Sequence, residues 1–210
     1  MKYRCIAYDI DGTLLNTAPA DLAGLQEVLR EELGMERPVS ALTGALGIPS
    51  RDILRVYGAP ESDLDRLARL WMERMHDHFE RVDVFPGTRA ALKALRARGV
   101  RLGVVTSKNS EEYAQDFVPF GLETYFDTIV TADDTALHKP HAEPLLKFLE
   151  RLGAAPEEAL YIGDSTYDRD CARAAKVDFA LAVWGSFEPE MEGVQRRLAR
   201  PEDVLALLGE

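Results

Sequence analysis

Apolar residues follow two different patterns along this chain, and the change of pattern divides it into parts. In residues 17–82 they recur every three or four positions, and no stretch has the pattern of a strand. From residue 100 onward, short apolar runs alternate with segments of helical spacing. The predicted strands there are 100–106, 126–131, 159–163 and 179–183, and the predicted helices from residue 83 on are 88–98, 110–117, 143–152, 166–176 and 201–208. This alternation predicts a parallel sheet covered by helices on both faces.

A further strand is predicted at the start of the chain. A short, mostly apolar run begins at Cys5 and ends at Asp9, where the sequence becomes acidic and then turns at Gly12. The helical block of residues 17–82 follows directly and interrupts the α/β pattern. We therefore expect residues 17–82 to form an inserted domain, and residues 1–16 and 83–210 to form the main one.

Composition and charge limit the classes of partner. The chain has 210 residues, of which 46% are hydrophobic, and a net charge of −11, which argues against nucleic acid or an anionic membrane surface as a partner. No apolar run approaches the about 20 residues of a membrane span, and the first residues do not resemble a signal peptide. The two cysteines, Cys5 and Cys171, are too few for a secreted disulfide framework. We expect a cytoplasmic protein that is a monomer or a homodimer.

Two aspartates at the end of the first predicted strand are the first candidates for chemistry. Asp9 and Asp11 lie two positions apart, so an extended backbone points both carboxylates to the same side. Two like charges at this distance repel unless a cation or a proton lies between them. The pair therefore indicates a functional site rather than a purely structural turn.

Polar residues also follow the other predicted strands. Thr106 and Ser107 follow the second strand, Lys139 precedes the helix after the third, and Asp164 and Asp168 follow the fourth. Ligands of open parallel sheets bind at the carboxyl ends of the strands, where these residues are expected to meet. Carboxylate oxygens suit Mg²⁺, whereas hydroxyl, amide and ammonium groups suit a phosphoryl group. The set predicts a site for phosphate and a metal ion.

These residues carry a resemblance to a known family. The segment Asp-Ile-Asp-Gly-Thr-Leu at residues 9–14 resembles the first signature of the haloacid dehalogenase-like hydrolase superfamily. Thr106, Lys139 and the pair Asp164 and Asp168 match its other three motifs in order and spacing. Within this superfamily the chain is similar to the branch of phosphoglycolate phosphatase and β-phosphoglucomutase. The resemblance implies an α/β fold, a Rossmann-like parallel sheet sandwiched by helices, with residues 17–82 as an all-helical cap domain.

The resemblance also implies roles for the acidic residues. Asp9 would be the nucleophile that forms an aspartyl-phosphate, and Asp11 would be the general acid and then the general base. Mg²⁺ would be held by the carboxylates of Asp9 and Asp164 and by the backbone carbonyl of Asp11. Asp168 would orient the waters of the metal, or Lys139.

Further residues are expected to contact the substrate. By resemblance, Thr106 and Lys139 are catalytic and bind the phosphate together with Gly12 and Ser107. Residues 47–51 resemble the cap loop that reaches the substrate in this branch. Within that loop, Arg51 is the candidate that would pair with a carboxylate or a second phosphate.

The presence of Asp11 favours one reaction within the superfamily. Dehalogenases and phosphonatases of this type lack the second aspartate, so we expect a Mg²⁺-dependent phosphatase. Its substrate would be a small phosphorylated metabolite, a phosphoglycolate-like compound or a sugar phosphate. A β-phosphoglucomutase-like phosphoryl transferase is the first alternative. An alternative of another class is a non-catalytic domain that carries a phospho-aspartate signal or binds a partner.

Overall fold

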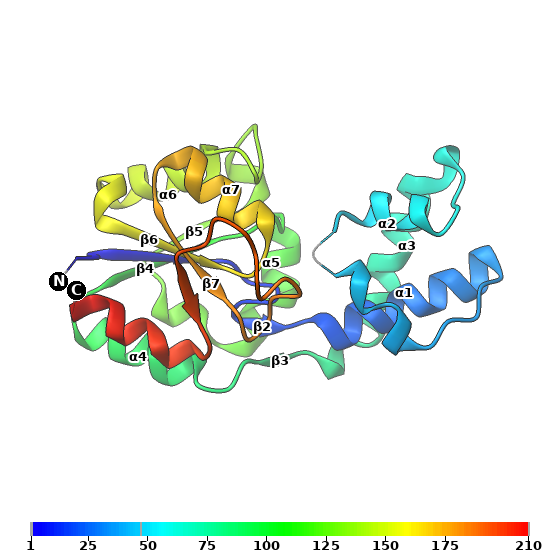
Figure 1. The fold of residues 1–210 in the computed structure, drawn as a ribbon, viewed down its shortest axis with the longest axis horizontal. Coiled ribbons are helices and arrows are strands. Elements are labelled where there is room, and N and C mark those ends of the chain that lie inside the picture. The colour runs from blue at the N-terminus through cyan, green and yellow to red at the C-terminus, as the bar shows by residue number, and fades with distance from the viewer. Residues whose placement is uncertain (1, 47, 210) are drawn as a thin grey trace. The chain divides into compact units, whose positions relative to one another are not determined.

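The chain folds into two units, which are described separately. The computed structural model describes residues 2–46 and 48–209 (Figure 1). The core unit combines Met1–Leu15 with Val84–Glu210, and the helical unit is Asn16–Asp83. None of the helices in the described ranges has the length and apolar character needed to cross a membrane.

A six-stranded sheet organises the core unit, and all of its pairings are parallel. The strand order is β5-β4-β1-β6-β7-β8, so β1 lies inside the sheet between β4 and β6. Every residue of β1 and β6 is buried, as expected for strands with both faces covered. The strands are β1 Cys5–Tyr8, β4 Arg101–Val105, β5 Thr128–Val130, β6 Ala159–Gly163, β7 Asp178–Ala182 and β8 Arg196–Leu198.

Helices cover both faces of this sheet. In Figure 1, α6 and α7 lie on one side of the sheet, and α4 lies on the other side with the C-terminal 3₁₀ helix. Leu145 and Phe148 of α6 and Cys171 of α7 pack with residues of the strands in one buried cluster. The α-helices are α4 Thr88–Ala97, α5 Ser110–Asp116, α6 Glu143–Leu152 and α7 Thr166–Ala175. The 3₁₀ helices are Val118–Phe120, Glu123–Tyr125, Ala132–Asp134, Pro156–Glu158 and Pro201–Gly209. The predicted parallel α/β sheet is confirmed.

Besides the short 3₁₀ helices, the structure differs from the predicted elements in three places. The sequence pattern did not predict β8, whose three residues form a parallel edge strand beside β7. The closing helix is a 3₁₀ helix rather than an α-helix. Two short strands, β2 Leu15–Asn16 and β3 Asp83–Val84, pair where the chain passes between the two units. Two-residue strands are too short to produce an apolar alternation in sequence.

The helical unit has its own apolar core. Its α-helices are α1 Ala18–Leu33, α2 Ser50–Val56 and α3 Leu64–Asp77, and its 3₁₀ helices are Val39–Ala41, Thr43–Ala45, Glu61–Asp63 and Phe79–Arg81. Gly24 lets α1 approach α3 closely, because a Cβ there would lie 2.6 Å from the backbone nitrogen of Met75. The indole Nε1 of Trp71 donates a hydrogen bond of 2.9 Å to the carbonyl of Asp21. The prediction of helices without strands holds for the described part of residues 17–82.

Candidate active site

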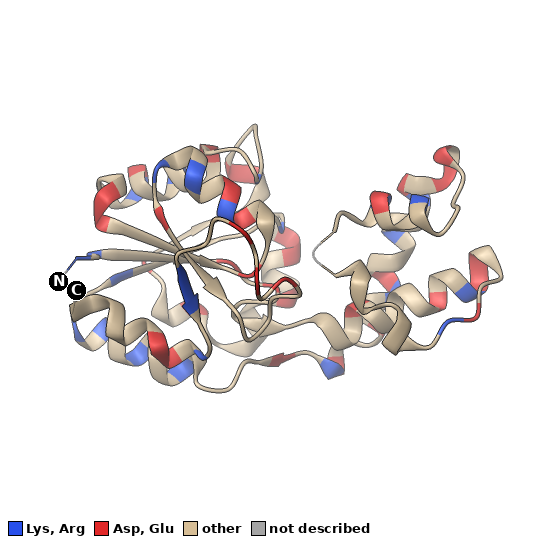
Figure 2. Ribbon diagram, viewed as in Figure 1, with Lys and Arg blue, Asp and Glu red and all other residues tan. Residues whose placement is uncertain are grey.

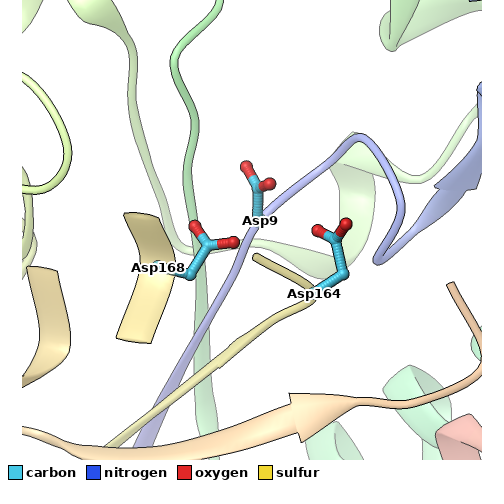
Figure 3. A group of neighbouring side chains, drawn as sticks. All are labelled: Asp9, Asp164 and Asp168. Atoms are coloured by element: carbon cyan, nitrogen blue, oxygen red, sulfur yellow. The ribbon is translucent and has the colours of Figure 1, made fainter. Parts of the chain in front are cut away.

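The ends of three neighbouring strands bring predicted site residues together, and the acidic ones come from two of these strands. Asp9 follows β1 and Asp164 follows β6, which pairs with β1, while Asp168 lies in the first turn of α7. One carboxylate oxygen from each of the three lies within 4.8 Å of the others (Figure 3). Thr106 follows β4 on the other side of β1 and is buried. The sheet order therefore collects residues that lie far apart in the sequence.

Lys139 lies among these carboxylates. Its Nζ is 2.9 Å from Oδ1 of Asp9 and 2.8 Å from Oδ1 of Asp168, and its side chain is only 5% exposed. Burial alone would lower the pKa of Lys139, but the charges of Asp168 and Asp9 raise the pKa above its usual value. Lys139 therefore carries its charge and neutralises part of the acidic cluster.

Asp168 is held by more hydrogen bonds than the other two aspartates. Its Oδ1 accepts from Lys139 and from the hydroxyl of Tyr161 at 2.8 Å, and its Oδ2 accepts from the hydroxyl of Ser165 at 2.6 Å. Burial would raise the pKa of Asp168, but Lys139 and these donors hold it below its usual value. Asp168 is ionised and well satisfied, which suits a group that orients Lys139 more than a direct metal ligand.

The carboxylates of Asp9 and Asp164 lack comparable compensation. Burial raises the pKa of Asp9 to about 7, despite the charge of Lys139. Burial, together with the charges of Asp168 and Asp9, raises the pKa of Asp164 well above its usual value. Burial thus shifts both carboxylates toward the protonated form, and a further positive charge nearby would oppose this shift.

The turn after Asp9 brings the backbone close to Asp164. Gly12 has φ +73°, and a Cβ at this position would lie 2.3 Å from Oδ2 of Asp164, so only glycine fits. The hydroxyl of Thr13 donates to Oδ1 of Asp164 at 3.3 Å. The carboxylate of Asp11 is partly exposed, and its Oδ1 has no hydrogen-bond partner among the described residues.

Lys108 is a buried residue of this site that the sequence analysis did not select. Its Nζ is 2.8 Å from Oδ2 of Asp116 and 3.4 Å from Oδ2 of Asp11, and its backbone nitrogen donates to Oγ1 of Thr106. Burial would lower the pKa of Lys108, but Asp11 and Asp116 raise it above its usual value. In the sequence, only its position two residues after Thr106 could have indicated that Lys108 belongs to the site. Tyr161 was also missed, because it lies within an apolar strand.

The donor set of the site fits a divalent cation. Five carboxylates share two lysines in this cluster, and they belong to Asp9, Asp11, Asp116, Asp164 and Asp168. Buried carboxylates in excess of their counter-charges are stable only with protons or an added cation. Hard oxygen donors of this kind suit Mg²⁺. The positive charge of the cation would stabilise Asp9 and Asp164 most, because burial raises the pKa of both.

Two other predicted residues lie outside this cluster. Ser107 is exposed directly after Thr106. Arg51 belongs to the helical unit, where its Nη1 is 2.9 Å from Oδ1 of Asp65 and its side chain is half exposed. Gly47, the first residue of the predicted substrate loop, lies outside the described residues.

Comparison with known proteins identifies the family. The model of the haloacid dehalogenase-like hydrolase family matches residues 6–182. The phosphoglycolate phosphatase of Nitrosospira multiformis is 37% identical over 185 residues, which cover 83% of this chain and 81% of that protein. The pyrophosphatase PpaX of Bacillus pumilus is 31% identical over 210 residues, which cover 97% and 95%.

A solved structure agrees with this result. The crystal structure of a HAD-superfamily hydrolase from Geobacter sulfurreducens superimposes with a TM-score of 0.75 at 29% identity, covering 99% of this chain and 97% of that one. The fold and the sequence similarity both support the family that the sequence motifs resemble, and this resemblance is confirmed. The chain belongs to the haloacid dehalogenase-like hydrolase family.

Proposed function

We propose that this protein is a Mg²⁺-dependent phosphatase that hydrolyses a small phosphorylated metabolite. The observation that carries the proposal is the buried contact of Lys139 with Asp9 and Asp168, beside the under-neutralised carboxylate of Asp164. A nucleophile, a fixed positive charge and oxygen ligands for a metal are the parts that phosphoryl transfer requires. Relatives of this chain are named as phosphatases and pyrophosphatases.

Asp9 is the nucleophile in this proposal. An oxygen of its carboxylate forms a bond to phosphorus as the bond from phosphorus to the ester oxygen of the substrate breaks. Lys139, 2.9 Å from Oδ1 of Asp9, favours the ionised carboxylate and neutralises charge on the transferring group. The product of this step is an aspartyl-phosphate on Asp9 and a free alcohol.

Asp11 serves as the acid and base. Its protonated carboxyl donates a proton to the leaving ester oxygen, and the resulting carboxylate then takes a proton from an attacking water. That water forms a bond to phosphorus as the acyl phosphate bond to Asp9 breaks, so Asp9 is restored and inorganic phosphate is released. The partly exposed side chain of Asp11 is compatible with access for water and substrate.

Mg²⁺ would be held by the carboxylates of Asp9 and Asp164 and by the backbone carbonyl of Asp11. When bound, it supplies positive charge that keeps the buried carboxylates ionised and stabilises charge on phosphate oxygens. Asp168 orients Lys139 through the hydrogen bonds described above.

Phosphate oxygens are bound by donors from the strand ends. We assign this role to Thr106, Ser107, Lys139 and the backbone at Gly12. Thr106 is buried beside the end of β1, and Ser107 is exposed next to it. Hydroxyl, amide and ammonium donors together match the acceptor oxygens of a phosphoryl group.

The helical unit would act as a cap that selects the substrate. We assign residues 17–82 to this cap and residues 1–16 and 83–210 to the catalytic domain, with Arg51 as a contact for a substrate carboxylate or second phosphate. The names of the relatives suggest phosphoglycolate and pyrophosphate as first compounds to test, followed by sugar phosphates. The proposal includes a cytoplasmic monomer or homodimer that binds neither nucleic acid nor membranes.

The nucleophile is tested with Asp9→Asn. We expect Mg²⁺-dependent hydrolysis of p-nitrophenyl phosphate to fall by at least about 10³-fold, because the amide cannot form the acyl phosphate. The far-UV circular dichroism spectrum should match that of the wild type. Activity of the variant at the wild-type level would refute the role of Asp9. Hexose-phosphate isomerisation by the wild type, in place of phosphate release, would refute the assignment as a phosphatase.

The metal site is tested separately with Asp164→Ala. Removal of a carboxylate ligand should raise the Mg²⁺ concentration for half-maximal activity by at least about 10-fold. An unchanged Mg²⁺ titration would contradict the assignment of Asp164.

A further inference from the structure

The turn that follows β7 touches both loops that carry the proposed metal ligands. This turn consists of Trp184, Gly185 and Ser186, here called the clamp turn. The backbone nitrogens of Gly185 and Ser186 both donate to the carbonyl of Ala182, at 3.2 and 3.1 Å, which fixes its shape directly beyond the strand. Each of its three residues makes a different contact with the site.

Trp184 binds the loop that follows Asp9. Its indole Nε1 donates a hydrogen bond of 2.9 Å to the carbonyl of Thr13. The ring packs edge-on against Phe85, with ring centroids 6.5 Å apart. The indole is thus held by packing, and its single donor group binds the backbone of the loop that follows Asp9.

Gly185 lies against the same loop with no space for a side chain. A Cβ at this position would lie 1.9 Å from the carbonyl oxygen of Gly12. The two backbones are therefore in direct contact, one residue beyond Asp11, whose carbonyl is a proposed metal ligand.

Ser186 binds the second loop. Its hydroxyl donates a hydrogen bond of 2.6 Å to the carbonyl of Asp164 and accepts one of 3.2 Å from the backbone nitrogen of Glu188. The hydroxyl is fixed by both bonds, so the backbone of Asp164 is tied to the clamp turn, as is the loop of Gly12 and Thr13.

The two loops also contact each other, which closes the arrangement. Thr13 donates its hydroxyl to Oδ1 of Asp164, and the Cα of Gly12 faces Oδ2 of the same carboxylate. The separation of the two loops is therefore set from both sides, by their mutual contact and by the clamp turn.

We propose that the clamp turn is a positioning element for the metal site, which sets the distance between the loop of Asp11 and Asp164 and thereby the affinity for Mg²⁺. This inference rests on the proposed function. The observed contacts of the clamp turn are with the backbone of the ligand loops, and the proposed effect acts through that backbone. Groups that orient metal ligands in this way typically account for 10- to 100-fold in metal affinity.

The chain offers a matched pair of variants to test this. Trp184→Phe and Trp71→Phe each remove one indole hydrogen bond of 2.9 Å to a backbone carbonyl, the first at the clamp turn and the second within the helical unit. Isothermal titration of the metal-free protein with Mg²⁺, without substrate, gives the dissociation constant. We expect Trp184→Phe to raise it by about 10-fold and Trp71→Phe to leave it unchanged.

Ser186 provides an independent test on the other loop. Ser186→Ala should also raise the dissociation constant for Mg²⁺ by about 10-fold, and Ser186→Thr, which keeps the hydroxyl, should restore it. The KM for p-nitrophenyl phosphate at saturating Mg²⁺ should stay near the wild-type value in both. Each variant is compared with the wild type by circular dichroism and by its thermal unfolding midpoint.

The outcomes separate this inference from the proposed function. A wild-type protein that binds no Mg²⁺ and hydrolyses no phosphate ester would refute the proposed function itself. If the wild type binds Mg²⁺ and the folded Trp184→Phe and Ser186→Ala variants bind it with equal affinity, only the proposed role of the clamp turn is refuted. An equal loss of affinity in Trp71→Phe would also refute it, because the effect would then be a general loss of stability.

Discussion

The core unit and the helical unit use the same charged residue types in opposite ways. The buried polar and charged residues of the described chain lie almost entirely in the core unit, with Thr17 as the one member from the helical unit. The charged members of this set are Asp9, Lys108, Asp116, Asp164 and Asp168. All of them belong to the candidate active site or its lysine contacts.

Several charged residues of the helical unit instead form exposed ion pairs. Arg55 lies 2.6 Å from both Asp52 and Glu61, and Arg66 lies 2.7 Å from Glu32. Figure 2 shows acidic and basic residues side by side along these helices. Exposed pairs are screened by water and contribute little, whereas unmatched buried charges are costly and persist where chemistry needs them. Burial, rather than residue type, distinguishes the charged residues of the candidate active site from those of the helical unit.

The largest effect expected from this contrast concerns stability. Lys139→Met leaves Asp9 and Asp168 buried without their counter-charge and should lower the free energy of unfolding of the metal-free protein by about 3–5 kcal/mol. Thermal unfolding, followed by circular dichroism, measures the loss.

Arg55→Ala is the matched control, because it also removes the partner of two carboxylates. Its side chain is exposed, so we expect an unfolding midpoint close to that of the wild type. Similar losses in Lys139→Met and Arg55→Ala would contradict the contrast between buried and exposed charges.

A second effect concerns pH and Mg²⁺. Burial raises the pKa of Asp9 from its ordinary 3.8 to about 7, and the pKa of Asp164 shifts in the same direction. Between pH 3.8 and about pH 7, Asp9 therefore binds more protons in the folded protein than in the unfolded chain. The contribution of Asp9 to the stability of the Mg²⁺-free protein is therefore full near pH 4 and is lost as the pH rises through about 7, and the contribution of Asp164 changes in the same direction.

Mg²⁺ replaces those protons and should reverse the loss. We expect the rise in unfolding midpoint on addition of Mg²⁺ to be larger at pH 8 than at pH 5.5, where protons compete for the same oxygens. Differential scanning fluorimetry at the two pH values measures it. Equal shifts at both, or a larger one at pH 5.5, would show that the added cation does not bind these carboxylates.

The smallest effect is expected in the helical unit. Arg51→Ala should raise the KM for a phosphate ester that carries a carboxylate, by about 10-fold, because a charge-assisted contact is lost. Hydrolysis of p-nitrophenyl phosphate, which lacks the carboxylate, serves as the control and should keep its KM. The same change for both substrates would contradict a role of Arg51 in specificity.

Much of the core unit could be predicted from sequence because its strands are buried on both faces. Such strands are continuous apolar runs, and the polar residue that ends each run marks the edge where ligands bind. Asp9, Thr106 and Asp164 were found in this way, and the structure places them at three neighbouring strand ends. The predicted bounds of β6 and α6 agree with the structure to the residue.

The features that were missed depend on tertiary contacts rather than local pattern. β8 contains two arginines in three residues, and it forms a strand because the edge of β7 offers hydrogen bonds. Lys108 has the sequence context of a solvated lysine, and only the fold brings Asp11 and Asp116 to it. The contacts of Trp184 with Thr13 likewise join segments at opposite ends of the chain.

The position of β1 inside the sheet has a consequence for biosynthesis. Cys5 pairs with Arg101 on one side and with Ala159 on the other. The first strand to leave the ribosome therefore cannot complete its pairing until the last third of the chain is synthesised. Pairings so distant in sequence form slowly, whereas a helical segment such as residues 17–82 can form its local contacts early. A nascent chain therefore displays the acidic loop long before Lys139, Asp164 and Trp184 exist to engage it. The candidate active site can thus be assembled only when synthesis is nearly complete.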